Sequence, residues 1–210
     1  MITLYYAKTD QLPPRENLLR SVRLNVETEK RDAWLQQSEL RARESLSGIL
    51  LLQRGLEQAN LMPEDEILCF EAQGRPYLQS GNVDFSISHT NGITVCAVMT
   101  AAEGRVGVDV ERSRERNGDS MKRIADRWFT QGERKLFLEN SVEAQFLEIW
   151  TGKEALSKQQ GGGLGVLARC DVTDLSEDAR LKAYRVEECY ITLCCPSSET
   201  PPHNVVRICL

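Results

Sequence analysis

The sequence has few of the residues that build the commonest metal-binding and histidine-dependent catalytic sites. It contains only two histidines among 210 residues, and none of its seven cysteines forms a Cys-x-x-Cys pair. Structural zinc sites usually combine such pairs with further cysteines or histidines, so the sequence argues against a zinc-binding domain. Several cysteines lie in apolar, strand-like runs, and we expect them to be reduced and buried.

Long apolar runs and an excess of positive charge are also missing. No stretch approaches the ~18 consecutive apolar residues of a membrane-spanning helix, and the N-terminus has no basic segment followed by an apolar run. We therefore expect a soluble, cytoplasmic protein that does not bind membranes. The formal net charge of −5 argues against a nucleic-acid-binding protein that uses a broad basic surface. Any phosphate would have to be bound by locally placed lysines and arginines.

What the sequence does contain is typical of a globular protein with a substantial core, since 41% of its residues are hydrophobic and 27% are charged. Apolar periodicity and turn signals predict helices and short strands in both halves of the chain. The helices are expected within residues 17–61, most clearly at 38–60, and at 121–128, 130–139 and 143–160. The strands are expected at residues 2–6, 67–71, 83–88, 93–100 and 106–111, and in the tail 181–210.

Hairpin signals between these strands indicate the fold class. Asn91-Gly92 lies between two strand-like runs and is a strong signal for a two-residue hairpin turn. Strands joined by hairpins form antiparallel sheets, whereas parallel strands need a longer crossover connection. The sequence therefore predicts an α+β protein with two loosely similar halves, residues 1–104 and 105–210. Each half is expected to be a small, mainly antiparallel sheet packed with helices.

The stretch Gly-Val-Asp-Val-Glu-Arg, residues 107–112, places two carboxylates on one face of a predicted strand. Side chains two residues apart in a strand project to the same side, about 6.6 Å apart along the chain. Asp109 and Glu111 can therefore converge on one hard cation such as Mg²⁺, which proteins hold through carboxylates, waters and phosphate oxygens. An amphipathic strand with its polar side in water has the same pattern, so the strand alone leaves both interpretations open.

The predicted helix 143–160 carries a second group of polar side chains. Trp150, Glu154 and Lys158 follow one another at intervals of four residues and share one face, while Lys153 lies about 100° round the helix axis. A tryptophan beside a glutamate that is flanked by two lysines is unusual for a purely solvated face. The alternative is an ordinary surface pair between Glu154 and Lys158 above a core tryptophan.

The strand end Phe-Ser-Ile-Ser-His-Thr, residues 85–90, contains the third group. A serine hydrolase is disfavoured because no Gly-x-Ser-x-Gly elbow is present, and the adjacent Ser88 and His89 would point to opposite faces of a strand. His89 is better suited to donate a hydrogen bond to a phosphate, with a structural histidine as the alternative. Strand ends and loops are where binding residues concentrate.

Small groups of basic residues are candidates for further phosphate contacts, with solvated surface charge as the alternative. They are Lys30, Arg31, Arg41, Arg43 and Arg75.

Four of these features occur together and in order in one known family. The sequence resembles the Sfp-type 4'-phosphopantetheinyl transferases. That family carries a Gly-(Lys/Arg)-Pro turn, a Ser-x-Ser-His strand end, a Gly-(Ile/Val)-Asp-(Ile/Val)-Glu strand and a Trp-x-x-Lys-Glu-(Ala/Ser)-x-x-Lys helix. In this chain they are residues 74–76, 86–89, 107–111 and 150–158. The order and spacing fit across roughly residues 40–165; each motif is modest alone, whereas four in order are specific.

The resemblance implies a pseudo-dimeric monomer whose active site lies between two related α+β halves. It implies an enzyme that transfers 4'-phosphopantetheine from coenzyme A to a serine of an apo acyl or peptidyl carrier protein and releases adenosine 3',5'-bisphosphate. The N-terminal half would contribute the side facing the adenine and the 3'-phosphate, and the C-terminal half the metal-binding strand and the 150–158 helix. Mg²⁺ would be the metal, with Mn²⁺ as an alternative.

The resemblance also implies a role for individual residues. Asp109, Glu111 and Glu154 fall on the Mg²⁺ ligands. Glu154 is in addition the expected general base, either directly or through a metal-bound water. Lys158 and Lys153 fall on pyrophosphate contacts, with Lys158 also catalytic. The expected contacts of coenzyme A are Ser88 and His89 at its phosphates, Gly74, Arg75 and Pro76 beside its adenine, and Arg41, Arg43, Lys30 and Arg31 as candidates for its 3'-phosphate.

The carrier protein is expected to dock on residues 112–129, which follow the metal strand; the alternative is a solvated loop whose Trp128 and Phe129 face the core. Carrier proteins are typically acidic with an apolar recognition helix, and this segment interleaves basic with apolar residues. Its basic residues are Arg112, Arg114, Arg116, Lys122 and Arg123. Within it, the polar run 113–120 is expected to be a mobile loop.

Two other functions fit parts of the same pattern. One is a different Mg²⁺-dependent phosphoryl hydrolase that uses the same carboxylates with water as nucleophile. The other is a non-catalytic protein that binds coenzyme A or a carrier. The presence of all three carboxylates and both lysines disfavours a site that has lost its activity.

Overall fold

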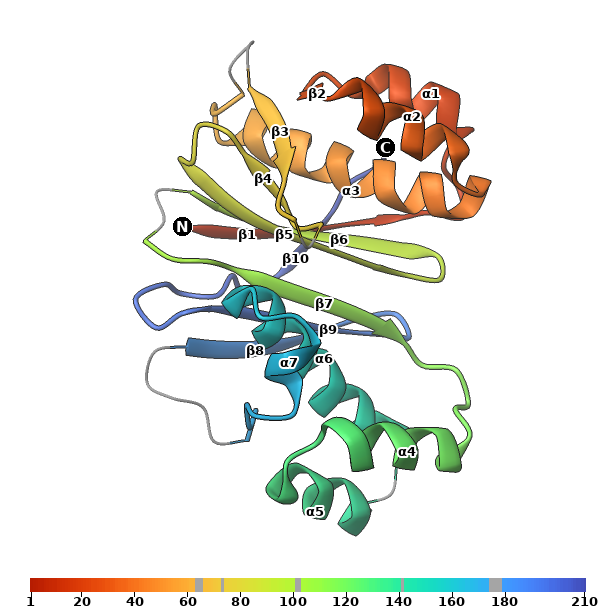
Figure 1. Cartoon of the computed structure of the whole chain (residues 1–210), viewed down its shortest axis with the longest axis vertical. Helices are drawn as coiled ribbons and strands as arrows, with labels where there is room; N and C mark the ends of the chain where they lie inside the picture. Colours follow the sequence, from red (N-terminus) through yellow and green to blue (C-terminus); the bar gives the residue numbers. More distant parts are fainter. Residues whose placement is uncertain (63–65, 73, 101–102, 141, 174–178) are drawn as a thin grey trace. The chain divides into compact units, whose positions relative to one another are not determined.

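The computed structural model of the chain describes residues 1–62, 66–72, 74–100, 103–140, 142–173 and 179–210 (Figure 1). The described chain forms two compact units. The first consists of residues 1–104 and 202–210, and the second of residues 105–201.

The first unit is built on a four-stranded sheet in the order β10-β1-β6-β5. Its strands are β1 (Ile2–Lys8), β5 (Val83–Thr90), β6 (Ile93–Thr100) and β10 (Val205–Arg207). β10 runs parallel to β1, and the other neighbours are antiparallel. A smaller sheet contains β2 (Asn25–Val26), β3 (Ile67–Phe70) and β4 (Pro76–Leu78). The helices of this unit are α1 (Arg15–Ser21), α2 (Thr28–Gln36) and α3 (Glu39–Gln58).

The long helix α3 packs on the larger sheet of this unit (Figure 1). Two glycines allow the close approach. A Cβ on Gly48 would lie 2.5 Å from a methyl carbon of Ile87, and one on Gly55 would lie 2.8 Å from a methyl carbon of Val98. The apolar side of α3, including Leu51 and other fully buried leucines, thereby forms the centre of the core of this unit.

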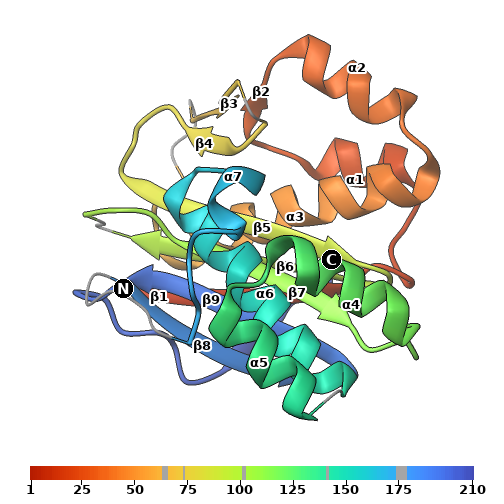
Figure 2. The same ribbon diagram turned by 60° about the horizontal axis from the view of Figure 1, so that its bottom comes forward.

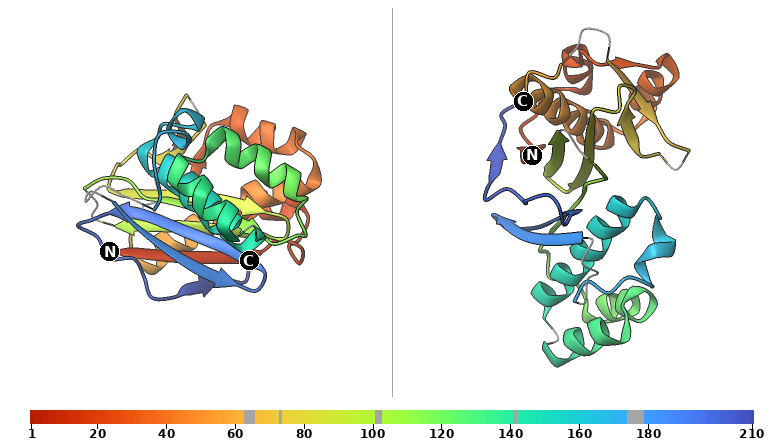
Figure 3. Two further views of the ribbon diagram at one scale, coloured as in Figure 1. Left: turned by 90° about the horizontal axis from the view of Figure 1, so that it is seen from below. Right: turned by 90° about the vertical axis from the view of Figure 1, so that its left-hand side faces the viewer.

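The second unit is built on a three-stranded antiparallel sheet in the order β7-β9-β8. Its strands are β7 (Gly107–Arg112), β8 (Ala179–Val186) and β9 (Cys189–Pro196), and its helices are α4 (Gly118–Trp128), α5 (Gln131–Asn140), α6 (Glu143–Gln160) and α7 (Leu164–Leu167). Figure 2 shows α6 lying along this sheet, and Figure 3 shows α4 and α5 on the other side of α6. α6 is therefore the central element of the unit.

Aromatic side chains fill the space between α6 and the two outer helices. The ring of Phe146 on α6 lies 5.6 Å from Phe129 and 5.8 Å from Phe137, measured between ring centroids, and 6.3 Å from Trp150. Phe146 is completely buried. Trp150 is half-buried, so it belongs to the edge of this core and not to a solvated helix face.

The α+β class predicted from the sequence is confirmed, and so are several individual elements. The helix predicted at 143–160 is α6, which ends at Gly161 in the left-handed conformation with φ +71°. The hairpin predicted at Asn91-Gly92 joins β5 to β6, with Gly92 at φ +86°. Each unit has a long helix on a mainly antiparallel sheet; a duplication relationship between the halves stays a prediction.

Two expectations differ from the structure. The stretch 17–61 is mostly helical as expected, but strand β2 at Asn25–Val26 interrupts it between α1 and α2. Residues 202–210 were expected in the second half, but β10 pairs with β1 and these residues belong to the first unit. Both differences depend on pairing with strands far along the chain, which local sequence patterns do not record.

No helix in the described ranges is long and apolar enough to cross a membrane. All seven cysteines are free thiols; four are buried, Cys69 and Cys170 are half-buried, and Cys209 is exposed.

Candidate active site

Strand β7 and helix α6 approach each other unusually closely in the second unit. A Cβ atom on Gly107 would overlap the carbonyl oxygen of Ala155 and would lie 2.6 Å from the backbone nitrogen of Gln159. Only glycine fits at the start of this strand without displacing the helix backbone. The close approach brings the polar residues of β7 next to the polar face of α6.

Asp109 on β7 forms an ion pair with Lys158 on α6. The Lys158 ammonium donates to Asp109 Oδ1 at 2.7 Å and to the carbonyl oxygen of Val108 at 3.1 Å. Asp109 is buried, and the valines that alternate with it, Val108 and Val110, are buried as well. The strand therefore holds Asp109 in a fixed place, and the sequence prediction that this acid and Lys158 act together is consistent with the geometry.

Glu111, two residues along the strand, contacts an arginine that follows it in sequence. Arg116 donates through Nη2 to Glu111 Oε2 at 2.5 Å. Burial raises the pKa of the Glu111 carboxyl above its ordinary value and the negative charge of Asp109 adds to this increase, although Arg116 opposes it.

Glu154 on α6 belongs to the same group. Burial raises the pKa of its carboxyl, and the charges of Asp109 and, less strongly, Glu111 raise it further, while Lys158 lowers it. Each of these electrostatic effects requires the groups to lie close together. We call Asp109, Glu111 and Glu154 the acidic cluster.

The acidic cluster has the chemistry of a site for a hard cation. It offers three carboxylates against two side-chain cations, Lys158 and Arg116. Burial raises the pKa of Glu111 and Glu154, and the charge of Asp109 raises both further. Carboxylate oxygens are the ligands that Mg²⁺ prefers. No group of three or more His, Cys, Asp or Glu side chains in the described ranges is arranged to hold a metal ion. Asp109 and Glu111 each contact a side-chain cation instead. The residue types fit a divalent cation, and the present arrangement satisfies them with Lys158 and Arg116.

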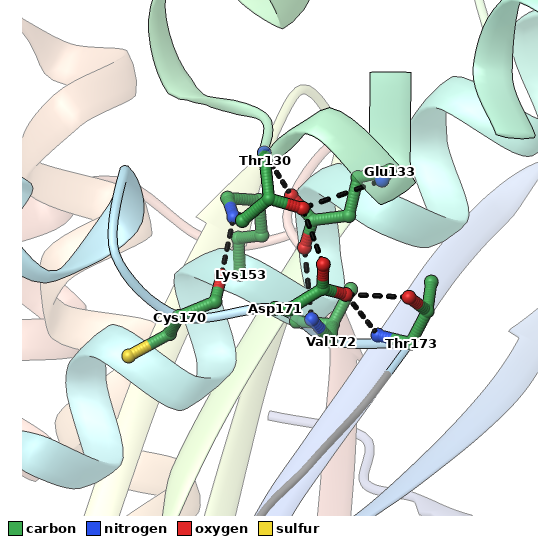
Figure 4. Close-up of polar contacts among 7 residues, drawn as sticks. All are labelled: Thr130, Glu133, Lys153, Cys170, Asp171, Val172 and Thr173. Carbon is green, nitrogen blue, oxygen red and sulfur yellow. Dashed lines mark hydrogen bonds and ion pairs between the residues drawn. The ribbon is translucent and has the colours of Figure 1, made fainter. Parts of the chain in front are cut away.

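Lys153, the neighbour of Glu154, does not join the acidic cluster. Its side chain is fully buried, and its ammonium donates to Glu133 Oε2 and to the carbonyl oxygen of Cys170, both at 2.6 Å (Figure 4). The expected pyrophosphate contact is therefore wrong for this structure, because the ammonium has no exposed surface and already has two short contacts. The helical spacing correctly put Lys153 on a different face from Glu154 and Lys158.

The segment after β7 is anchored by the first turn of α6. Glu143 accepts hydrogen bonds from the hydroxyl of Ser113 at 2.7 Å and from the amides of Arg114 and Arg116 at 3.2 and 3.3 Å. Burial alone would raise the pKa of the Glu143 carboxyl, but these hydrogen bonds hold it below its usual range. The expected mobile loop is thus tied down over residues 113–116.

These contacts also reduce the set of residues in segment 112–129 that can contact a carrier protein. The Arg116 side chain is only 13% exposed and lies between Glu111 and Glu143, so it is not available to a carrier protein. Arg114, Lys122 and Arg123 are exposed and remain candidates, and Arg112 is half-buried.

Apart from Lys153 and Lys158, the expected contacts of coenzyme A lie in the first unit. His89, at the end of β5, places Nδ1 3.3 Å from Oε2 of the buried Glu44 on α3. Ser88 beside it is buried, in agreement with the opposite faces predicted for the two side chains. A carboxylate partner at Nδ1 orients the imidazole ring.

The Gly74-Arg75-Pro76 turn has a fixed structure. Gly74 has φ +88°, and its amide donates to the carbonyl oxygen of Glu71 at 2.8 Å. Arg75 donates through Nη2 to both carboxylate oxygens of Asp84, at 3.1 and 3.0 Å, and to the carbonyl oxygen of Phe85 at 3.0 Å. The guanidinium of Arg75 therefore fastens the turn to β5, and Pro76 begins β4.

The basic residues proposed for the 3'-phosphate lie in different environments. Arg41 is exposed, whereas Arg43 is half-buried and donates to the carbonyl oxygen of Leu12. Lys30 lies 4.1 Å above the ring of Phe70. In the described part of the chain, the buried Nε atoms of Arg31 and Arg43 have no hydrogen-bond partner.

Several residues of these sites have no signal in the sequence motifs. Two of them lie outside the four motifs: Arg116 precedes Trp150 by 34 residues, and Glu143 precedes Glu154 by 11. Glu44 and Asp84 are ordinary acids of α3 and β5. Only Glu133 had a local signal, since Thr130 and Glu133 have the spacing of a capping box. The structure confirms that capping box, with Thr130 N donating to Glu133 Oε2 at 2.8 Å and Glu133 N donating to Thr130 Oγ1 at 3.3 Å.

Comparison with known proteins identifies the family. The family model described as the 4'-phosphopantetheinyl transferase superfamily matches residues 105–200, the range that holds the acidic cluster. The 4'-phosphopantetheinyl transferase AcpT of Salmonella typhi is 31% identical over 167 residues, which cover 77% of this chain and 81% of the relative. The 4'-phosphopantetheinyl transferase gsp of Aneurinibacillus migulanus is 32% identical over 146 residues, covering 67% of this chain and 58% of the relative. The chain belongs to the 4'-phosphopantetheinyl transferase superfamily, as its four motifs predicted.

Proposed function

We propose that the protein transfers 4'-phosphopantetheine from coenzyme A to a serine hydroxyl of an apo carrier protein and releases adenosine 3',5'-bisphosphate. The observation that carries this proposal is the acidic cluster next to Lys158, in the part of the chain that matches the superfamily. We further expect a monomer that acts in the cytoplasm, as the resemblance implies.

Asp109, Glu111 and Glu154 would hold Mg²⁺, or Mn²⁺ in its place. When bound, the cation neutralises negative charge on the pyrophosphate of coenzyme A. The chain itself supplies the rest of the site: β7 fixes two of the carboxylates, and Gly107 lets α6 bring the third beside them. Lys158 and Arg116 would keep contact with the cluster or turn to phosphate oxygens.

Glu154 is the proposed general base. The serine oxygen forms a bond to the phosphorus that carries the pantetheine group, and the bond from that phosphorus to the oxygen shared with the other phosphate breaks. The serine proton passes to a carboxylate, and a carboxyl whose pKa is raised by burial and neighbouring charge accepts a proton more readily at neutral pH. Lys158 would offset the negative charge that develops on the leaving phosphate.

The first unit would bind the nucleotide part of coenzyme A. His89, oriented by Glu44, is the proposed hydrogen-bond donor to a phosphate, and Ser88 is its buried neighbour. The Gly74-Arg75-Pro76 turn is proposed to border the adenine through its backbone, because the Arg75 side chain holds Asp84. Arg43 and Arg41 remain the proposed contacts of the 3'-phosphate.

An acidic carrier protein would dock on the exposed basic residues that follow β7. Arg114, Lys122 and Arg123 are exposed, and Met121 and Ala125 on the opposite side of α4 are buried in the core. The basic side of α4 therefore faces away from the core of its own unit, as a docking surface requires.

The reaction can be tested with purified protein, coenzyme A, Mg²⁺ and apo forms of several acyl and peptidyl carriers. Intact-mass spectrometry should show at least one carrier gaining the mass of phosphopantetheine, with adenosine 3',5'-bisphosphate as the second product. Consumption of coenzyme A without carrier modification would instead indicate a phosphoryl hydrolase. Binding of coenzyme A or carrier without any turnover would indicate a non-catalytic binding protein.

A further inference from the structure

Lys153 and Glu133 form an ion pair in which neither side chain has exposed surface. The Lys153 ammonium lies 2.6 Å from Glu133 Oε2 and 2.6 Å from the carbonyl oxygen of Cys170. Lys153 belongs to the middle of α6, Glu133 to the first turn of α5, and Cys170 to the segment that follows α7. One buried charge pair therefore connects three parts of the second unit.

Hydrogen bonds around this pair extend the connection, as Figure 4 shows. Glu133 also accepts from the amides of Thr130 and Val172, both at 2.8 Å. The Thr130 hydroxyl donates to Asp171, and Asp171 Oδ1 accepts from the amide of Thr173 at 2.9 Å. We call Thr130, Glu133, Lys153 and residues 170–173 the buried cluster, after the buried ion pair at its centre; Thr130 and residues 170–172 are half-buried, and Thr173 is exposed.

A buried ion pair is a poor device for stability alone. Removing two charges from water is costly, and apolar side chains of similar volume commonly stabilise a protein as well or better. Hydrogen-bonded charges instead fix geometry, because each contact forms in only one arrangement of the segments that carry it. The buried cluster should therefore fix the position of α6 relative to α5 more than it increases the stability of the unit.

The direction in which the Glu154 side chain points depends on that position of α6. It follows Lys153 directly and lies about 100° from it around the helix axis, and about 60° from Thr151 in the other direction. Thr151 meets Thr192 of β9, hydroxyl to hydroxyl at 2.7 Å. Glu154 thus lies between a side chain held by the sheet and one held by the buried cluster.

We propose that Lys153 is a positioning residue, whose ion pair with Glu133 fixes the rotation of α6 and thereby directs the Glu154 carboxylate towards Asp109 and Glu111. This inference rests on the proposed function, in which Glu154 is the general base. Lys153 itself touches neither substrate nor the acidic cluster.

The test is a double-mutant cycle of Lys153→Met, Glu133→Gln and the two together, with steady-state kinetics and thermal unfolding measured for each. Each single variant should unfold at a lower temperature, since it leaves one buried charge unpaired. Because small displacements at a reacting group are costly, kcat of Lys153→Met should fall by about 100-fold. The KM values for coenzyme A and carrier should stay within about twofold, as expected when ground-state binding is unaffected.

The double variant separates positioning from stability. With both charges removed, the unfolding temperature should recover most of the loss, but kcat should remain low because the directional contacts are gone. Recovery of kcat together with stability would overturn the proposal, and so would a wild-type kcat in Lys153→Met. Phe137→Leu is the matched control: it disturbs the aromatic core of the same unit without removing a hydrogen bond or ion pair of the buried cluster, and it should lower stability but not kcat.

Lys153→Arg decides the question if the methionine variants do not fold. It keeps the charge, but a guanidinium cannot preserve both short contacts of the ammonium, so kcat should fall by about tenfold with unchanged KM values. An unchanged kcat in this variant would contradict the positioning role.

Amide hydrogen exchange separates failure of this inference from failure of the proposed function. If the wild-type protein transfers nothing to any carrier, the proposed function fails. The exchange rate of the Glu154 amide still reports on the buried cluster. Faster exchange of the Glu154 amide in Lys153→Arg than in wild type supports the positioning role, and equal exchange contradicts it.

Discussion

Helix α6 carries two lysines, five residues apart, whose ammonium groups both lie 2.6–2.7 Å from a carboxylate oxygen. Each ammonium also donates to a backbone carbonyl oxygen, but the exposure of the two lysines and the charges around them differ. Lys153 has no exposed side-chain surface. Its partner Glu133 also accepts hydrogen bonds from the backbone amides of Thr130 and Val172. Lys158 is 29% exposed, and it faces Asp109 in a cluster with two further carboxylates.

This difference shows how the balance of charge distinguishes a structural ion pair from a candidate active site. Burial alone would raise the pKa of the Asp171 carboxyl in the buried cluster, but hydrogen bonds from Thr130 and Thr173 hold it below its ordinary value. In the acidic cluster, burial and mutual repulsion raise the pKa of Glu111 and Glu154. Acids that repel one another at neutral pH are stabilised by a further cation, whereas a network whose charges are already paired and hydrogen-bonded is not.

The largest expected effect is loss of transfer when the acidic cluster is broken. Asp109→Ala and Glu154→Gln should each lower the rate of carrier modification by about 1,000-fold or more, because charge stabilisation and proton transfer both depend on these carboxylates. Mass spectrometry of the carrier gives the rate, and circular dichroism should show an unchanged fold. Near-normal turnover in either variant would mean that the acidic cluster is not the site.

The same substitution should have opposite effects on stability in the two clusters. Glu133→Gln should lower the free energy of unfolding by about 3–5 kcal/mol, since it leaves the Lys153 charge buried and unpaired. Glu154→Gln should raise it by about 1 kcal/mol in metal-free buffer, because it removes a carboxylate that the others repel. Urea denaturation measures both values, and changes of equal sign would contradict the distinction between the clusters.

Removing Lys158 should reduce transfer less than removing an acid. Lys158→Met should lower kcat by about 100-fold, the usual cost of losing one group that stabilises developing charge. The KM for the carrier should not change, because Lys158 is not part of the proposed docking surface. Steady-state kinetics at saturating Mg²⁺ provide the measurement, and a change confined to the carrier KM would argue against its role at the phosphate.

The two clusters should also respond to pH in opposite directions. The raised pKa of Glu154 means that the folded state binds its proton more tightly than the unfolded state, so metal-free stability falls as the pH rises above the ordinary range of a glutamate. The lowered pKa of Asp171 means that its contribution is lost as the pH falls below the ordinary range of an aspartate. Glu154→Gln should flatten the first slope and Asp171→Asn the second. Unfolding free energies across the acid and neutral range test both, and an unaltered slope in either variant would contradict the corresponding pKa shift.

The smallest expected effect concerns the carrier. Arg114→Glu should raise the KM for an acidic carrier by roughly 3–10-fold without changing the KM for coenzyme A, as is usual for an exposed charge at an interface. Arg116→Glu, at a buried neighbour that contacts Glu111, should lower kcat instead. An unchanged carrier KM in Arg114→Glu would remove this residue from the docking surface.

Local patterns in the sequence were enough to predict the members of the acidic cluster. Alternation along β7 put Asp109 and Glu111 on one face, and the four-residue spacing along α6 did the same for Glu154 and Lys158. The order of four motifs then linked the two elements. The alternation and the spacing depend only on residues that are close together in the chain, whereas the link between β7 and α6 came from the resemblance to the family.

The environment of each charge could not be predicted in the same way. Lys153 and Lys158 belong to one motif, and only the positions of Glu133 and Cys170, 20 and 17 residues away, make one of them buried. Arg116 had a basic, polar sequence context typical of a surface loop, yet Glu143 from another element covers it. Helical periodicity gives the direction of a side chain but not what packs against it.

Equilibrium binding of Mn²⁺, followed by electron paramagnetic resonance in the presence of coenzyme A, tests the distinction between the two clusters most directly. The account predicts that wild type and Asp171→Asn bind Mn²⁺ with equal affinity, and that Asp109→Ala binds it about 100-fold more weakly or worse. Wild-type affinity in Asp109→Ala, or a loss of binding in Asp171→Asn, would contradict it.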